Sequence, residues 1–101
     1  MNYRFLDQAR TEYYEAITYY EDKSVGLGDR FAEEIAKTLE RVRQNPELWS
    51  NLTKKHRICR AHDFPYGLIY EIISGEAGGD IIEIVAVTHL HRKPGYWQDR
   101  T

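Results

Sequence analysis

The stretch Ile84-Val85-Ala86-Val87-Thr88-His89-Leu90-His91-Arg92-Lys93-Pro94-Gly95-Tyr96-Trp97 decides the fold of this chain. It begins as an apolar strand and ends abruptly in two histidines, two cations and two large aromatic residues. A buried strand holds its own end rigidly, and a rigid strand end is a good position from which to present polar side chains. The stretch therefore predicts a central strand with a candidate site where that strand ends.

A second apolar block, Phe64-Pro65-Tyr66-Gly67-Leu68-Ile69-Tyr70-Glu71-Ile72, lies upstream of the first. Together the two blocks and the preceding residues predict three strands, at about residues 57–62, 66–74 and 80–88. The run Gly75-Glu76-Ala77-Gly78-Gly79-Asp80 is rich in residues that tolerate positive φ, so it predicts the hairpin loop between the last two strands. Strand 80–88 is nearly continuously apolar, which is typical of a strand covered on both faces.

The first half of the chain predicts a short strand and two helices. Residues 2–6 alternate polar and apolar, and Asp7 is a candidate N-cap for a helix over about residues 8–23. Helical spacing recurs twice, in an apolar stripe on each helix: Leu6, Ala9, Tyr13, Ala16, Ile17 and Tyr20, then Phe31, Ile35, Leu39 and Val42. Residues 24–28 contain two glycines that break the first helix, and Asn45-Pro46 ends the second. So short a connection predicts an antiparallel helical hairpin.

The order strand, helix, helix, three strands predicts an α+β fold in a single domain over residues 1–101. We expect an N-terminal strand, an antiparallel helical hairpin and a three-stranded antiparallel meander, with the helices packed on one face of a small sheet. Residues 46–56, which contain Leu48, Trp49 and Leu52, are expected to form a loop.

Composition excludes several classes of protein. The chain has 101 residues, 42% hydrophobic and 30% charged, which is ordinary for a globular domain. Neither a signal peptide nor a membrane-spanning segment is expected from its sequence. Its one cysteine, Cys59, is expected to fill the core, and this usage fits a reducing cytoplasm. A formal net charge of −2 argues against direct binding of duplex DNA.

The charge is nevertheless uneven along the chain. Residues 1–50 hold ten acidic residues against seven Lys and Arg, whereas residues 51–101 hold six against seven and all four histidines. Any cationic surface must come from residues 54–60 and 89–93, so the sequence predicts a local basic face on a slightly acidic body. Such a face suits a phosphate or an acidic peptide.

A few side chains at the end of the predicted strand 80–88 are candidates for catalysis or binding. His89 and His91 are two residues apart and point the same way on a strand, but no further ligands stand at a matching spacing, so neither a metal nor a cofactor is expected. Either histidine can exchange a proton near neutral pH, and Arg92 can grip a phosphate or carboxylate with two hydrogen bonds. Tyr96 and Trp97 either stack on a ligand or cover the core, and for Trp97 the core is favoured. Because alternate residues of a strand face opposite sides, only one of Arg57 and Arg60 is expected to share a surface with Arg92.

Four tyrosines crowd the first helix. Tyr13 and Tyr20 lie on its apolar stripe and are expected in the core, with their hydroxyls at the rim. Tyr14 and Tyr19 lie off the stripe, so they either pack locally or line a partner groove.

In this order the two blocks resemble the RelE/ParE superfamily, the toxin halves of bacterial type II toxin–antitoxin pairs. The resemblance extends over essentially the whole chain. The motifs that carry it are Asn45-Pro46, Arg57, Phe64-Pro65-Tyr66 with Tyr70, and His89-x-x-Arg92-x-Pro94-x-Tyr96-Trp97. The tail from Tyr96 to Arg100 looks like the ParE branch, that of the plasmid stabilisation proteins, more than the RelE branch.

The resemblance implies one of two mechanisms. ParE-like members inhibit DNA gyrase by protein–protein contact, and the matching target-binding residues here are Arg92, Tyr96, Trp97 and Arg100. RelE-like members cleave mRNA on the ribosome without a metal, and the matching catalytic set would be Arg57, His89, His91, Arg92 and Tyr96. The acidic balance favours the first mechanism, since a nuclease that docks on the ribosome should be strongly basic.

Both mechanisms imply the same partner. This is a cognate antitoxin with a segment that folds on binding, for which the candidate contacts are the exposed aromatics Tyr14, Tyr19 and Trp49 together with Arg60. A homodimer or a hetero-oligomer with the antitoxin is the expected assembly. A homologue that has lost toxicity but still binds an antitoxin is a third interpretation.

Overall fold

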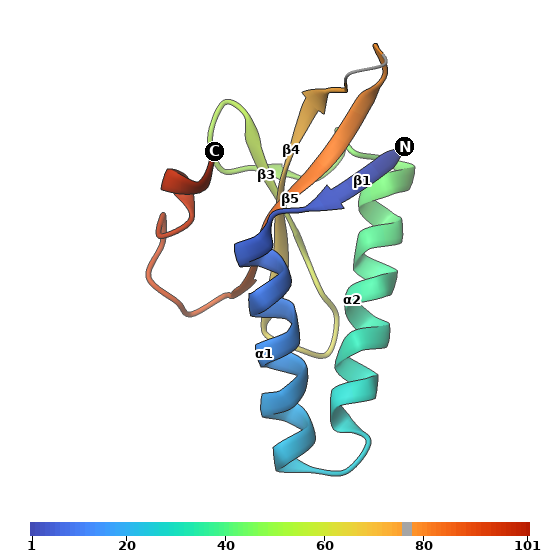
Figure 1. Ribbon diagram of the computed structural model, residues 1–101, viewed down its shortest axis with the longest axis vertical. Helices are drawn as coiled ribbons and strands as arrows, with labels where there is room; N and C mark the ends of the chain where they lie inside the picture. The colour runs from blue at the N-terminus through green and yellow to red at the C-terminus, as the bar shows by residue number, and fades with distance from the viewer. Residues whose placement is uncertain (76–77) are drawn as a thin grey trace.

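Two helices pack against a five-stranded mixed sheet, as Figure 1 shows. The computed structural model describes residues 1–75 and 78–101. The elements follow in the order β1 (Asn2–Phe5), α1 (Asp7–Lys23), α2 (Leu27–Gln44), β2 (Ser50–Asn51), β3 (His56–Arg60), β4 (Tyr66–Ser74), β5 (Asp80–His89) and a final 3₁₀ turn, η1 (Gln98–Arg100). This confirms the predicted α+β class and the predicted order of helices and longer strands.

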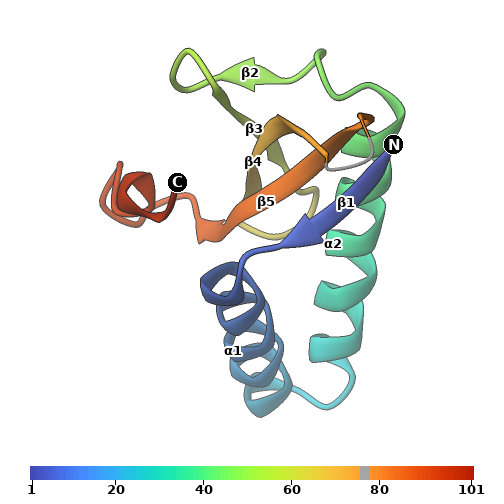
Figure 2. The same ribbon diagram turned by 45° about the horizontal axis from the view of Figure 1, so that its top comes forward.

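The sheet has the strand order β1-β5-β4-β3-β2. β1 runs parallel to β5, and every other neighbouring pair is antiparallel. β5 therefore lies inside the sheet, and its residues from Ile82 to Thr88 are buried, as its apolar sequence predicted. The expected loop over residues 46–56 is wrong in one respect, because Ser50 and Asn51 pair with β3 and extend the meander by a fourth short strand (Figure 2). Of the predicted hairpin loop over residues 75–80, Glu76 and Ala77 lie outside the described residues.

The two helices form the predicted antiparallel hairpin. Gly26 adopts φ +88° in the connection, and Gly28 lets the helices approach closely, since a Cβ there would lie 2.7 Å from the Ile17 carbonyl oxygen. The expectation that Asp7 caps α1 is wrong, because Leu6 occupies the N-cap position and Asp7 is already helical. The Asp7 carboxylate instead lies in the first turn, where the positive end of the helix dipole favours it. Within the described residues, no helix is both long and apolar enough to cross a membrane.

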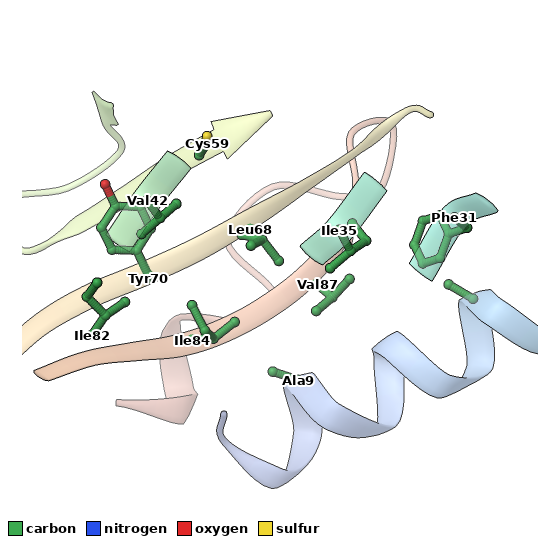
Figure 3. Close-up of a cluster of buried hydrophobic side chains, with 11 residues drawn as sticks. Ala9, Phe31, Ile35, Val42, Cys59, Leu68, Tyr70, Ile82, Ile84 and Val87 are labelled. Atoms are coloured by element: carbon green, nitrogen blue, oxygen red, sulfur yellow. The ribbon is translucent and has the colours of Figure 1, made fainter. Parts of the chain in front are cut away.

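The main core lies between the helices and one face of the sheet (Figure 3). Both predicted helical stripes contribute to it, and Cys59 is buried within it as expected. Tyr70 is fully buried and donates its hydroxyl hydrogen bond to the Pro46 carbonyl, which ties β4 to the turn that ends α2. Burial raises the pKa of Tyr70 to about 12, so this phenol stays a donor throughout the physiological range.

A second, smaller core covers the opposite face of the sheet. It consists of Ile58, Ile69, Val85 and Ala86 under the ring of Trp97, which is 5% exposed. The interpretation of Trp97 as a cap for the core is confirmed. The C-terminal segment, residues 90–101, is thereby held against the sheet face that the helices leave open.

His56 is buried beside Trp97, with the two ring centroids 4.8 Å apart. Its Nδ1 and Nε2 lie 2.9 Å and 2.8 Å from the hydroxyl oxygens of Thr53 and Thr101. Burial has the largest effect on the pKa of His56 and lowers it below the ordinary value of 6.5. The charge of Glu71 raises this pKa, and the charge of Lys55 lowers it further.

This environment predicts a loss of stability in acid. Because the unfolded chain binds a proton at His56 more readily than the folded chain does, the free energy of unfolding should fall as the pH decreases below 6.5. Urea unfolding between about pH 7.5 and pH 5 measures this dependence, which should be shallower in His56→Gln because an amide does not titrate. Identical pH dependence in the two proteins would contradict the prediction.

Candidate functional site

The candidate site lies at the end of β5, which extends beyond the end of the neighbouring strand β1. β1 ends at Phe5, opposite Ile84, whereas β5 continues to His89. Two side chains supply the hydrogen bonds on that uncovered edge of β5. The Glu12 Oε1 accepts from the Val87 amide at 3.1 Å, and the Arg100 Nη1 donates to the Val85 carbonyl at 3.0 Å. An acidic and a basic side chain therefore replace the missing strand.

The Glu12 carboxylate gathers three side chains of the C-terminal segment. Arg100 donates from Nη1 to Oε1 at 2.8 Å and from Nη2 to Oε2 at 3.1 Å. The Tyr96 hydroxyl donates to Oε2 at 2.7 Å, and the Arg92 Nη1 lies 3.4 Å from the same oxygen. We call Glu12, Arg92, Tyr96 and Arg100 the strand-end cluster.

Both arginines of the cluster lie close to the ring of Tyr96. The Arg92 Cζ is 3.7 Å and the Arg100 Cζ 5.0 Å from the centre of its ring, both within range for cation–π attraction. Burial and the hydrogen bond to Glu12 raise the pKa of Tyr96, and the same carboxylate raises the pKa of Arg100. The phenol is therefore neutral and its proton is already committed, which makes it a poor acid or base in this arrangement.

Exposure differs sharply between the two arginines. The Arg100 side chain is 14% exposed and that of Glu12 11%, whereas that of Arg92 is 53% exposed. The Arg92 guanidinium is therefore the more accessible of the two. A planar guanidinium can bind a carboxylate or a phosphate with two hydrogen bonds. Arg100, also predicted to bind the target, has its guanidinium hydrogen-bonded to Glu12 and to the Val85 carbonyl.

The two histidines lie next to the cluster. β5 ends at His89 and His91 follows it in a turn, yet their ring centroids are only 5.1 Å apart. The His89 Nδ1 accepts from the His91 amide at 3.1 Å, so a neutral His89 carries its proton on Nε2. Within the described residues, no group of three or more potential metal ligands forms.

A pocket of about 500 Å³ opens on the sheet face opposite the helices. Ile58, Ile69 and Trp97 contribute apolar surface to it, and its cationic lining residues are Arg60, Arg92 and Lys93. Among the described residues, no aspartate or glutamate lines this pocket. The predicted local basic face is therefore present, and it has the chemistry to accept an anionic group.

The arginines of β3 separate as their alternation predicted. Arg60 lines the pocket with Arg92, whereas the Arg57 Nη1 donates to the Glu47 and Trp49 carbonyls at 2.9 Å and 2.8 Å. Arg57 pairs in register with Tyr70, whose ring belongs to the core on the helical side. The structure thus brings His89, His91, Arg92 and Tyr96 together and leaves Arg57 apart from them.

The residues predicted to bind an antitoxin are spread over the surface. Tyr14 and Tyr19 are 59% and 54% exposed on α1, and Arg60 lines the pocket on the other side of the sheet. The expectation that Trp49 is exposed is wrong, because its ring packs against the core and its Nε1 donates to the Arg41 carbonyl at 3.3 Å. The last carbonyls of a helix lack partners within the helix, so the indole satisfies one of them for α2.

Sequence reasoning missed Glu12, the centre of the cluster. The sequence nevertheless indicates that Glu12 is unusual, because it lies three residues after Ala9 and four before Ala16, on the apolar stripe of α1. A carboxylate on a buried stripe requires a hydrogen-bonded or charged partner. The identity of that partner, 88 residues away, needed the fold.

Comparison with known proteins gives matches in sequence and in fold. The sequence model of the family described as the ParE toxin of type II toxin–antitoxin system, parDE, matches residues 3–94. A solved structure titled as the chromosomal ParDE toxin–antitoxin system from P. aeruginosa is similar, with a TM-score of 0.62 and 10% identity over 90% of this chain and 97% of that chain. No curated protein is a significant match. At such identity the structural likeness supports the fold, and the family match includes Glu12 and Arg92 but ends before Tyr96.

Proposed function

This chain belongs to the ParE toxin family of type II toxin–antitoxin systems, and from that premise we propose that it inhibits DNA gyrase by protein–protein contact in the cytoplasm and is neutralised by a cognate antitoxin. The observation that carries the proposal is the exposed Arg92 guanidinium, stacked on Tyr96 at the end of a buried strand. An arginine braced by an aromatic ring on a rigid element is typical of residues that dominate protein interfaces.

The electrostatics of the site support an inhibitor over a nuclease. Cleavage of RNA through its 2′-hydroxyl needs a proton acceptor and a proton donor near the phosphate. Both Glu12 oxygens already accept hydrogen bonds, and the Tyr96 hydroxyl already donates one. The net charge of −2 also lacks the excess of cations that docking on ribosomal RNA requires.

The antitoxin contact follows from the spread of the candidate residues. Tyr14 and Tyr19 lie on α1, whereas Arg60 lines the pocket on the opposite face of the sheet. A compact partner would cover only one of these regions. An extended antitoxin segment that folds while it wraps the toxin would reach both, in a hetero-oligomer.

The test is pulse-labelling of DNA and protein synthesis after induced expression of the toxin alone, followed by supercoiling assays with purified gyrase. DNA synthesis should stop first, and Arg92→Ala should weaken inhibition of supercoiling about 30-fold, the cost of losing a 2 kcal/mol contact. Arg10→Ala is the matched control, because Arg10 is 55% exposed and its ion pair, with Asp7 at 3.7 Å, includes no residue of the cluster. Unchanged inhibition in Arg92→Ala would contradict the proposed contact.

One observation favours an mRNA endonuclease as the second candidate. The cation-lined pocket brings His89, Arg92 and Tyr96 to one place, where an RNA phosphate would be attracted. In that case protein synthesis would stop first, and His91→Ala would abolish toxicity while antitoxin binding persists. A chain that binds antitoxin yet stops neither synthesis would be the non-toxic homologue.

A further inference from the structure

The C-terminal segment, residues 90–101, carries the exposed Arg92 but contains only a single 3₁₀ turn, η1. Figure 2 shows it beyond the end of β5, away from α2. Such a segment depends on side-chain contacts to hold one conformation. Trp97 fixes its middle by burial, and the contact of Thr101 with His56 fixes its end.

The placement of Arg92 and Tyr96 depends on a third contact. Among the contacts of the described residues, Glu12 is the one acidic side chain that reaches Arg92, Tyr96 and Arg100 together. It also accepts from the Val87 amide, so its own position is fixed by β5. The carboxylate therefore joins a rigid strand to three side chains of an irregular segment.

Charge explains why a neutral residue would not serve equally well. Arg92 and Arg100 both lie near the ring of Tyr96 and both pair with the Glu12 carboxylate, so the cluster carries one net positive charge. Without Glu12, Arg92 would lose the acidic side chain that holds it beside Tyr96, and Arg100 would be nearly buried without an opposite charge. Arg92, the more exposed of the two, is the one free to move away from Tyr96.

We propose that Glu12 is a positioning residue of the target-binding surface, which holds Arg92 and Tyr96 in the orientation that the target meets. The proposal rests on the proposed function, in which Arg92 contacts gyrase. Glu12 itself is nearly buried, with 11% of its side chain exposed, whereas 53% of the Arg92 side chain is exposed. Its effect on inhibition passes through Arg92 and Tyr96.

The test compares Glu12→Gln with Glu15→Gln, one turn away on the same helix and exposed. Glu12→Gln keeps the size of the side chain and an acceptor for Val87 but removes the charge. We expect the IC50 for gyrase supercoiling to rise at least about tenfold in Glu12→Gln, the equivalent of 1.4 kcal/mol, and to stay unchanged in Glu15→Gln. Amide exchange of Val87 and of η1, measured by NMR, should accelerate while exchange in the α2 core stays unchanged.

A double variant protects the test against simple misfolding. Glu12→Gln with Arg100→Gln removes both buried charges, so global stability should largely recover. Arg92 is then without its acidic partner, and inhibition should remain weak. Recovery of inhibition along with stability would overturn the proposal, because Glu12 would then matter only for folding.

The two proposals fail in different ways. If the wild-type chain does not inhibit gyrase, the proposed function fails, and NMR relaxation of the Arg92 side chain still tests the role of Glu12. Equal mobility of Arg92 in wild type and Glu12→Gln would overturn the positioning role by itself. Greater mobility of Arg92 and Tyr96, with the α2 core unchanged, would support it.

Discussion

Replacing Phe31 with alanine should cost about 3–5 kcal/mol of unfolding free energy, the range for removing a buried aromatic side chain. Phe31 is fully buried, and its ring lies 5.0 to 5.3 Å from the rings of Tyr20, Phe64 and Tyr66. These rings come from α1, from the turn before β4 and from β4 itself, so the cavity would open where the helical hairpin meets the sheet. Rings packed from several sides cannot all move to fill it.

The loss is large for a domain of this size. Total stability is typically about 5–15 kcal/mol, so Phe31→Ala would remove roughly a fifth or more of it and lower the melting temperature by roughly 15–30 °C. Urea unfolding followed by circular dichroism measures the change. Tyr14→Ala is the control, since Tyr14 is also aromatic but 59% exposed, and it should change stability by at most about 0.5 kcal/mol. A loss below about 1 kcal/mol in Phe31→Ala would contradict the packing described for this ring.

The sequence predicted the longer elements because their hydrophobic periods are unambiguous. Phe31, Ile35 and Val42 repeat at helical spacing and are all buried, and the continuous apolar run of β5 lies inside the sheet. Proline and glycine marked the ends of α2 and the connection between the helices. These signals are local, so no tertiary information was needed to interpret them.

Elements that depend on distant partners were missed. β2 has two residues, too few to show a period, and exists because Ser50 and Asn51 meet β3. Trp49 was expected among the exposed aromatics, whereas its indole binds a carbonyl at the end of α2. Asp7 has the right chemistry for an N-cap but stands one residue late.

The candidate site was predicted only in part, because some of its residues are close in sequence and others are far apart. Arg92, Tyr96 and the two histidines were found because one stretch of sequence contains them all. Glu12 was missed because its partners are up to 88 residues away. Arg92 is exposed and Arg100 is nearly buried, and this difference depends on where the Glu12 carboxylate lies.

Arg100→Ala should be the most damaging change in the strand-end cluster, at about 3 kcal/mol, the cost of breaking a buried ion pair from one side. The guanidinium makes two hydrogen bonds to Glu12 and one to the Val85 carbonyl, and both charged side chains are less than 15% exposed. Alanine would leave the carboxylate nearly buried with one direct cation, Arg92, at 3.4 Å. It would also leave the Val85 carbonyl without its donor.

A double-mutant cycle separates this pair from an ordinary surface contact. If Glu12 and Arg100 depend on each other, Glu12→Gln and Arg100→Gln together should cost less than the sum of the single changes, by about 1–3 kcal/mol. Since the pair is nearly buried, raising the salt concentration from about 0.05 M to 0.5 M should change this coupling little, whereas an exposed pair would be screened. Arg10→Ala, at the exposed pair with Asp7, should cost no more than about 0.5 kcal/mol. Additive costs would mean that Arg100 and Glu12 stabilise the protein independently, and the edge of β5 would then be held by the backbone contacts of each residue alone.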